Sequence, residues 1–171
     1  MSDTLEQVPS VLVMMATYNG EKYVSEQIDS ILVQEGVNVT LLISDDGSSD
    51  ATPRICSRYA EDLPNVRFSV NEKNKGLAKN FMDMLYSSDA TSFDYFAFSD
   101  QDDYWMPNKL NKAIEAIAAA GEGPRLYYSD VCNVDEQLNG GSREYGAFAP
   151  YADSFALLLT VNWASGCTMV F

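Results

Sequence analysis

The sequence predicts an α/β protein built on a mainly parallel β-sheet with helices on both of its faces. Short, continuous apolar runs alternate along the chain with segments whose apolar residues recur every three or four positions. Runs of the first kind are typical of strands buried on both faces, and segments of the second kind are typical of amphipathic helices. Their regular alternation indicates strand–helix–strand units, in which consecutive strands lie parallel.

The first part of the chain contains two such units. Residues 11–16 (VLVMMA) form the first predicted strand, and a helix follows because Val24, Ile28, Ile31 and Leu32 are spaced to share one helical face. A second strand is predicted at residues 39–43, before the sequence DDGSSD. The next helix is expected to have Thr52 as its N-cap and Pro53 in its first position, where a missing N–H costs nothing.

The rest of the chain continues this alternation and then changes character. Strands are predicted at residues 66–70, 95–99 and 126–129, and the helices between them carry the apolar stripes Leu77/Phe81/Met84/Leu85 and, after Pro107, Leu110/Ile114/Ile117. Residues 131–150 are rich in glycine and asparagine, so we expect loops and an excursion at the sheet edge. Residues 167–171 (CTMVF) have the pattern of a strand that stops without a polar end. We therefore expect a fold truncated at its C-terminal side.

The amino-acid composition excludes several classes of function. The 171 residues carry 25 acidic and 11 basic side chains, a formal charge of −14, and no histidine. An acidic surface repels phosphate backbones, which argues against nucleic-acid binding, and the lack of imidazole excludes histidine-based nucleophile systems, zincin motifs and other sites that need histidine. The length suits a single domain.

Cysteine usage and hydropathy indicate the compartment. Cys56, Cys132 and Cys167 are far apart and odd in number, which favours buried free thiols in a reducing environment. The N-terminus lacks the features of a signal peptide, and no apolar run is long enough to span a membrane. We expect a cytoplasmic protein, with peripheral contact at the inner face of the membrane left open for the full-length protein.

Polar sequences follow four of the predicted strands. They are TYNG at 17–20, DDGS at 45–48, NKGLAKN at 74–80 and DQDD at 100–103. In open α/β sheets, ligands bind beyond the carboxyl ends of the strands, so we expect these sequences to converge on one crevice. The first two are also explained as turns, with helix capping added in the second.

The sequence DQDD is the strongest single indication of a ligand. Three carboxylates within four residues repel one another unless a cation neutralises them. Ligation by oxygen alone suits Mg²⁺ or Mn²⁺, and Mg²⁺ is commonly held by one or two carboxylates together with substrate phosphates. A solvated acidic loop is the alternative explanation, whereas an EF-hand would need spaced ligands and a central glycine that are missing.

The net charge favours a diphosphate bridged by such a metal, because the chain has no glycine-rich phosphate loop. Lys73, Lys75 and Lys79 cluster in the third crossover and would add positive charge. Lys79, one turn into the predicted helix, is the best placed of the three. Lys73 and Lys75 are equally well explained as solvated residues at the start of the helix.

Four motifs, in order and spacing, resemble those of family 2 glycosyltransferases: ATYNGEKY at 16–23, SDDGSSD at 44–50, NKGLAKN at 74–80 and FSDQDDYWMPNKL at 98–110. Each is weak alone, but four in sequence are specific, and the resemblance covers nearly the whole chain. The SDQDDYW form and ASGCTMVF at 164–171 most resemble the rhamnosyltransferase-type branch, which makes bacterial surface polysaccharides. The resemblance implies a single GT-A domain over residues 1–171. Residues 10–130 would be its Rossmann-like nucleotide-sugar-binding half, and 131–171 the start of its acceptor-binding half.

The resemblance also implies a nucleotide-sugar site at the matching positions. Tyr18 would stack on the base and Asp46 would hydrogen-bond the base edge. Lys79 falls where the family often has a basic residue near the nucleotide. The other residues expected at the donor site are Thr17, Asn19, Glu21 and Gln101.

Asp100 and Asp102 match the Asp-X-Asp element of the family. The resemblance implies that Asp100 faces the ribose and that Asp102 ligates a divalent metal, Mg²⁺ or Mn²⁺, on the diphosphate. Asp103 would support the metal or cap the loop before Pro107. The implied activity is an inverting transfer from a dTDP- or UDP-linked donor, with rhamnose as one candidate sugar, to a glycan or lipid-linked saccharide acceptor.

An inverting transfer needs a carboxylate that deprotonates the acceptor hydroxyl. In the family this aspartate usually follows the strand at which the sequence stops, so we expect the catalytic base beyond Phe171. Asp130 and Asp153 are the late acidic residues, but neither has the family context. Residues 1–171 alone are therefore expected to bind nucleotide and metal weakly and to transfer no sugar.

Two other function classes stay open. A non-catalytic nucleotide-sugar-binding module would share the same crevice. A Mg²⁺-dependent phosphotransfer domain is disfavoured, because no Asp-X-Asp-X-Thr nucleophile motif is present.

Overall fold

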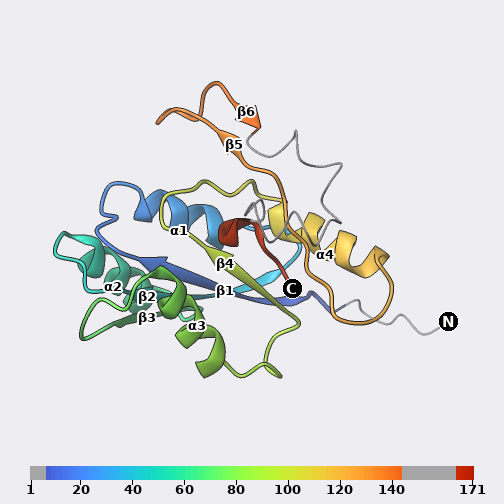
Figure 1. Ribbon diagram of the computed structural model, residues 1–171, viewed down its shortest axis with the longest axis horizontal. Helices are drawn as coiled ribbons and strands as arrows, with labels where there is room; N and C mark the ends of the chain where they lie inside the picture. Colours follow the sequence, from blue (N-terminus) through green and yellow to red (C-terminus); the bar gives the residue numbers. More distant parts are fainter. Residues whose placement is uncertain (1–6, 144–164) are drawn as a thin grey trace.

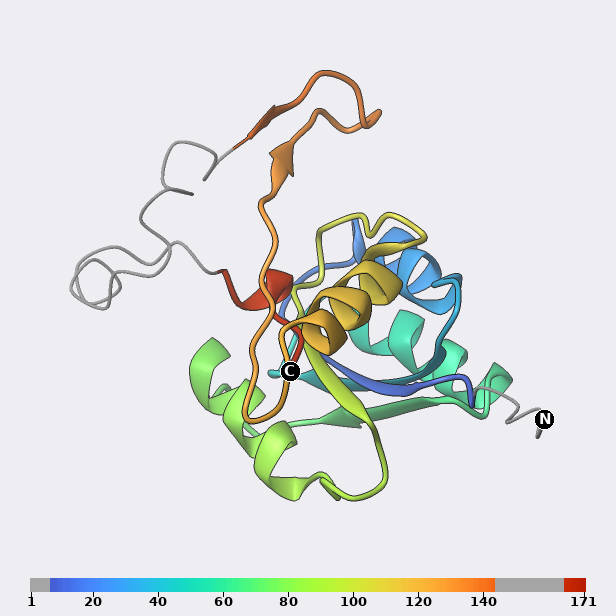
Figure 2. The ribbon, with the colours of Figure 1, turned by 90° about the vertical axis from the view of Figure 1, so that its right-hand side faces the viewer.

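The computed structural model describes residues 7–143 and 165–171. Over these residues the main sheet has four parallel strands in the order β3-β2-β1-β4 (Figures 1 and 2). The strands are β1 (Ser10–Thr17), β2 (Asn38–Asp45), β3 (Val66–Val70) and β4 (Tyr95–Ser99). Each is followed by a helix: α1 (Val24–Leu32), α2 (Thr52–Asp62), α3 (Leu77–Ser87) and α4 (Lys109–Ala119). The predicted α/β fold is confirmed.

β1 lies inside the sheet, and its two faces pack against different helices. Figure 1 shows α1 and α4 on one side of the sheet and α3 on the other. Because both faces are covered, the strand needs apolar residues at every position rather than at every second one. The side chains in the core shared with α1, α2 and α4 are Val11, Val13 and Met15, and those in the core shared with α3 are Leu12, Met14 and Ala16.

The predicted apolar stripes of α1 and α4 are the buried faces of these helices, whereas Leu77, the first residue of the stripe predicted for α3, is 59% exposed. In α1, Val24, Ile28 and Ile31 are fully buried against the sheet. In α4, which begins two residues after Pro107, Leu110 and Ile117 are buried in the same core. The periodic apolar spacing thus identified the packing face of these helices correctly.

The start of α2 differs from the prediction. Thr52 is the first helical residue and Ala51 stands at the N-cap, so the Thr52 side chain does not cap the helix; the Asp50 carboxylate accepts the N–H of Thr52 at 2.9 Å. The Thr52 hydroxyl Oγ1 instead accepts the N–H of Gly20 at 2.8 Å, which joins α2 to the loop after β1. The Thr52 hydroxyl thus bonds a group 32 residues away in the sequence, a contact that the local pattern does not indicate.

The chain after α4 departs from two predicted strands. At the described residues 126–129 only an isolated antiparallel bridge forms, between Tyr127 and Val170, and Val170 also bridges Ala97 of β4. The strand expected at 167–171 is wrong in its first half, where Gly166–Thr168 form a short 3₁₀ helix, η2. The 3₁₀ turn forms here because the C=O of Ser165 accepts both the N–H of Thr168, at 2.9 Å, and the Thr168 hydroxyl, at 2.7 Å.

The segment after residue 130 forms the expected excursion from the sheet. β5 (Cys132–Asn133) and β6 (Ser142–Arg143) make a separate antiparallel pair that extends away from the main sheet in Figure 2. Cys56 and Cys167 are buried as expected, but Cys132 on this pair is exposed, because the excursion has no core to cover it. The predictions for residues 144–150 and for Asp153 lie outside the described residues.

The topology brings the loops that follow the strands to one edge of the sheet. All four strands run in the same direction, so the loops that follow them gather along one edge of the sheet. The chain passes from β1 to β2 on one side and brings β4 to the other side of β1. The gap between the ends of β1 and β4 is therefore a topological switch point, where open α/β sheets bind their ligands.

Candidate functional site

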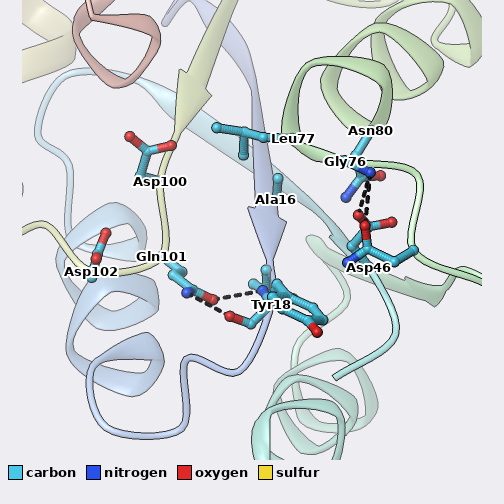
Figure 3. Close-up of a pocket in the computed structure, with 11 residues that line it drawn as sticks. Ala16, Tyr18, Asp46, Gly76, Leu77, Asn80, Asp100, Gln101 and Asp102 are labelled. Atoms are coloured by element: carbon cyan, nitrogen blue, oxygen red, sulfur yellow. Dashed lines mark hydrogen bonds between the residues drawn. The ribbon is translucent and has the colours of Figure 1, made fainter. Parts of the chain in front are cut away.

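A cavity of about 500 Å³ lies at this switch point (Figure 3). In Figure 3, Asp100 and Asp102 face it from the end of β4, and Asp46, Gly76 and Asn80 face it from the loop after β2 and the start of α3. Six of the nine residues predicted from the sequence line it: Thr17, Tyr18, Asp46, Asp100, Gln101 and Asp102. Asn19, Glu21 and Lys79 lie outside its lining.

Gln101 fixes the backbone of Tyr18. Its Oε1 accepts the N–H of Tyr18 at 2.8 Å, and its Nε2 donates to the C=O of Tyr18 at 3.0 Å. The amide packs so closely that a Cβ on Gly20 would lie 2.2 Å from Oε1. The Tyr18 side chain stays 51% exposed, so its ring is free to receive a flat ligand.

The two neighbouring aspartates after β2 have different surroundings. Asp45 is fully buried and accepts the hydroxyl of Thr17 at 2.9 Å and the N–H groups of Gly47 and Ser48 at 3.1 and 2.8 Å. Gly47 adopts a φ of 84°, a left-handed value that glycine adopts without strain. Asp45 therefore organises the turn, as the structural alternative predicted, and it leaves Asp46 to face the cavity.

Asp46 holds the start of α3. Its Oδ1 accepts the side-chain N–H of Asn71 at 3.0 Å and the backbone N–H of Lys75 at 2.8 Å, and its Oδ2 accepts the N–H of Gly76 at 2.8 Å. The residue is only 4% exposed. One carboxylate thus sets the wall of the cavity opposite Asp100.

Asn19 and Glu21 join loops instead of lining the cavity. Asn19 donates its N–H to the hydroxyl of Ser48 at 2.8 Å and accepts the N–H of Ser49 at 2.9 Å. The Glu21 carboxylate accepts the N–H of Ala51 at 2.8 Å, at the start of α2. Both residues hold the loop after β1 against the loop after β2.

Lys79 pairs with an acidic residue of its own helix. Its ammonium lies 2.7 Å from Asp83, which also accepts from Lys75 at 3.0 Å. These pairs hold the pKa of Asp83 below its ordinary value. The ammonium of Lys79 reaches the cavity only by leaving Asp83.

Asp100 and Asp103 form a compact group with Cys167. A carboxylate oxygen of each and the Cys167 sulfur all lie within 4.8 Å of one another. Burial raises the pKa of both carboxyl groups, the charge of Asp103 raises that of Asp100 further, and a hydrogen bond with Cys167 partly offsets the change in each. Repulsion between these acids is thus only partly relieved by the protein.

Lys109 is the cation nearest this group. Its Nζ donates to the C=O of Cys167 at 2.6 Å and lies 3.7 Å from the centre of the Trp105 ring. Burial lowers the pKa of Lys109 to about 8, although the charges of Asp103 and Asp100 act in the opposite direction. Lys109 therefore joins α4 to the segment after η2 beneath the acidic loop.

Asp102 differs from its neighbours. Its side chain is exposed, and none of the hydrogen bonds among residues 7–143 and 165–171 involves it. It also lines a second cavity of about 790 Å³ on its other side, together with Trp105, Lys109 and residues of the β5–β6 segment. An unbonded carboxylate between two cavities is available to a ligand in either.

Asn80 lines the cavity but was not among the site residues predicted from the sequence. It is 1% exposed, lines the cavity from α3, accepts the Ser44 hydroxyl at 2.6 Å and donates to the Ser44 C=O at 2.9 Å. The available signal was its position: Asn80 lies three residues after Leu77 and four before Met84, which places an amide on the apolar stripe.

Comparisons with known proteins agree with this geometry. The profile of glycosyl transferase family 2 matches residues 12–165. The chain is 40% identical over 105 residues to the dTDP-rhamnosyl transferase RfbG of Shigella flexneri, covering 60% of the chain and 36% of that protein. It is 39% identical over 107 residues to the putative glycosyltransferase EpsE of Bacillus subtilis, covering 62% and 37%. The chain thus spans about a third of the length of these relatives.

Solved structures show the same fold. The crystal structure of S. aureus TarS 1-349 in complex with UDP-GlcNAc has a TM-score of 0.56 and 29% identity, covering 64% of this chain and 31% of that one. The mannosyltransferase PcManGT from Pyrobaculum calidifontis, in complex with GDP-Man and Mn²⁺, has a TM-score of 0.58 and 24% identity, covering 66% and 33%. Within the described ranges, the helices are too short or too polar to cross a membrane.

The matched profile spans most of the chain, and the structural neighbours share its overall fold. The chain belongs to glycosyl transferase family 2 and has the GT-A fold.

Proposed function

We propose that this chain is the donor-binding part of an inverting, metal-dependent glycosyltransferase. The observation that carries the proposal is one cavity of about 500 Å³ that brings together Tyr18, Asp46, Asp100 and Asp102 from three strand ends. The donor is a nucleotide sugar, linked to dTDP or UDP. The similarity to a dTDP-rhamnosyl transferase makes rhamnose the first candidate sugar, and the UDP-GlcNAc complex of TarS supports a pyrimidine nucleotide.

The proposed roles follow the positions of the side chains. The exposed ring of Tyr18 stacks on the base, Asp46 offers a carboxylate edge to it, and Asp100 faces the ribose. Thr17 lines the floor between them. Gln101 acts on the donor by holding Tyr18, and Asn19 and Glu21 act by holding the loops that carry the pocket. Lys79 is assigned an auxiliary contact to phosphate.

The acidic loop fits a divalent cation. Carboxylate oxygens are the ligands that Mg²⁺ and Mn²⁺ prefer, and Asp102 offers an exposed carboxylate beside two acids whose repulsion the protein only partly relieves. We therefore assign Asp102 as the metal ligand. Such an ion supplies positive charge to the diphosphate leaving group.

The acceptor side is proposed to begin after residue 130. The glycan or lipid-linked saccharide acceptor would approach from the second cavity, which shares Asp102 with the first. We place the general base beyond Phe171. We place the protein in the cytoplasm, with the inner face of the membrane as the site where sugar is transferred to the acceptor. Residues 1–171 alone are expected to bind donor without transferring sugar.

Titration calorimetry with UDP or dTDP tests the proposal. The wild-type chain is expected to bind nucleotide more tightly with Mn²⁺ than without, and Asp102→Asn is expected to lose this difference while its unfolding transition stays unchanged. Asp62→Asn, an exposed carboxylate at the far end of α2, serves as the control. Nucleotide binding with no metal effect in the wild type would contradict the proposal. In the full-length protein, donor binding without any transfer would favour a binding module instead.

A further inference from the structure

Three polar side chains are buried where α1 meets the segment after β4. Gln27, Ser30 and Gln34 are 0%, 2% and 7% exposed. Gln27 and Ser30 lie in α1 and Gln34 just beyond it, at spacings of three and four residues that place them along one face. Burying polar groups costs free energy unless they are hydrogen-bonded, so the partners of all three side chains matter.

Gln27 holds the start of the acidic loop. Its Nε2 donates to the hydroxyl of Ser99 at 2.9 Å, and that hydroxyl donates to the C=O of Asp100 at 2.8 Å. Both side chains are fully buried. The Oε1 of Gln27 has no hydrogen-bond partner among the described residues, so this amide keeps one bond to the loop at the expense of an unpaired acceptor.

Ser30 and Gln34 hold the far end of the same loop. The hydroxyl of Ser30 accepts the N–H of Trp105 at 3.1 Å. Gln34 donates to the C=O of Met106 at 2.8 Å and accepts the N–H of Leu110 at 3.0 Å. The loop is thus tied to α1 and the residues just after it on both sides of Asp102, through the Ser99 hydroxyl on one side and through backbone groups of Trp105 and Met106 on the other.

We propose that Gln27, Ser30 and Gln34 are positioning residues that hold the Asp102 carboxylate ready for its cation. Asp102 is exposed and takes no hydrogen bond from the described residues, so its side chain is positioned by the backbone of residues 100–106 and by the bonds that anchor that backbone. Two bonded ends on a rigid helix keep that backbone in one arrangement before a ligand arrives. The metal-binding half of this inference rests on the proposed function.

Among the described residues the Oε1 of Gln27 has no hydrogen-bond partner, so packing alone does not require an amide at this position. An apolar side chain of similar size would fill the same space without leaving a buried acceptor unpaired. Proteins accept such local costs mainly at functional sites. Gln27→Leu therefore separates an effect on stability from an effect on the position of the loop. It removes the unpaired acceptor, which costs stability, together with the bond to Ser99, which holds the loop.

Hydrogen–deuterium exchange and Mn²⁺ titration in the presence of UDP test the proposal on the whole chain. Gln27→Leu is expected to keep or raise the unfolding temperature, to speed exchange in residues 100–106, and to weaken Mn²⁺ binding about five-fold, the worth of one net hydrogen bond. Ser25→Ala, on the exposed face of the same helix, is the control and should change none of these. Should Gln27→Leu fold poorly, Ser30→Ala makes a smaller change and should expose the Trp105 amide to exchange in the same way.

A double-mutant cycle identifies the path through Ser99. Ser99→Ala and Gln27→Leu remove two ends of one hydrogen bond, so their effects on Mn²⁺ binding should fall well short of additivity. Unchanged exchange in residues 100–106 would overturn the proposal, and so would faster exchange with wild-type metal affinity. Failure of the wild-type chain to bind Mn²⁺ with nucleotide would contradict the proposed function. That outcome differs from failure of the present inference, in which the wild type binds Mn²⁺ and the variants behave like it.

Discussion

The side-chain amide of Gln101 pairs with the backbone of Tyr18 through two hydrogen bonds, at 2.8 and 3.0 Å. The pair bridges the loops that follow β4 and β1, across the switch point of the sheet. It fixes the distance between the loop that carries Asp102 and the ring proposed to stack on the nucleotide base. One side chain therefore ties the loop after β4 to the loop after β1 at the donor cavity.

Gly20→Ala is expected to break this pair. A Cβ at Gly20 would lie 2.2 Å from Oε1 of Gln101, so the amide must move away from Tyr18. Loss of two hydrogen bonds should lower the free energy of unfolding by about 1–3 kcal/mol and weaken nucleotide binding. Chemical denaturation measures the first effect and calorimetry the second.

The control is Gly166→Ala, because a Cβ at Gly166 has no other atom within 4 Å. If Gly20→Ala and Gly166→Ala were equally stable and bound nucleotide alike, the contact between Gly20 and Gln101 would be unimportant.

Asp46→Ala should loosen the start of α3. The substitution leaves the N–H groups of Lys75 and Gly76 and the amide of Asn71 without their carboxylate acceptor. Since Asp46 is buried, we expect a loss of about 2–3 kcal/mol in the free energy of unfolding and faster hydrogen exchange at residues 75–80. Asp46→Asn, which keeps one acceptor oxygen, should be milder. Equal exchange in wild type and Asp46→Ala would argue against this role.

Asp83→Asn is expected to release Lys75 and Lys79. Both ammonium groups pair with Asp83 of α3, the helix whose first turn lines the donor cavity. Freed from that charge, they should raise the affinity for a nucleoside diphosphate about two- to five-fold at low salt, the scale of an exposed ion pair. Calorimetry at low and high salt measures this, because screening should abolish the gain. A gain that survives Lys79→Ala would remove Lys79 from the donor site.

Lys109 should make stability depend on pH in the alkaline range. Its pKa is about 8 in the folded protein and 10.5 ordinarily, so between these values the unfolded chain binds more protons and stability rises with pH. The full effect is worth about 3 kcal/mol, gained by pH 10.5 and lost as the pH falls through 8. Denaturation at pH 7 and pH 10 measures it.

Two comparisons isolate this contribution. The raised pKa values of Cys56, Cys167 and Tyr59, each due first to burial, act in the opposite sense above pH 9. The difference between wild type and Lys109→Met cancels them, and Lys112→Met on the exposed side of α4 controls for the loss of a charge. A pH profile shared by wild type and Lys109→Met would disprove the prediction.

Much of the donor cavity was predictable because it follows from local patterns. The run at 11–16 and the stripe through Ile28 predicted the layers of the fold, and the rule that ligands lie beyond strand ends pointed to Asp46, Asp100 and Asp102. Asn19 and Glu21 were expected at the same site but serve to join its loops. Both are polar residues in the loop that follows a strand, as ligand-binding residues are, but their hydrogen-bond partners are groups of the neighbouring loop.

The sequence by itself determined the four strands of the main sheet, their parallel direction and the polar residues that follow them, because each depends on the spacing of apolar and polar side chains within one element. The tertiary structure alone decided the partners: Thr52 with Gly20, Gln27 with Ser99 across 72 residues, and Cys167 with Asp103. These contacts form between elements that meet only after the chain has crossed the sheet several times. A hydrogen bond depends on distance and direction in space, and neither is encoded in the local pattern around either partner.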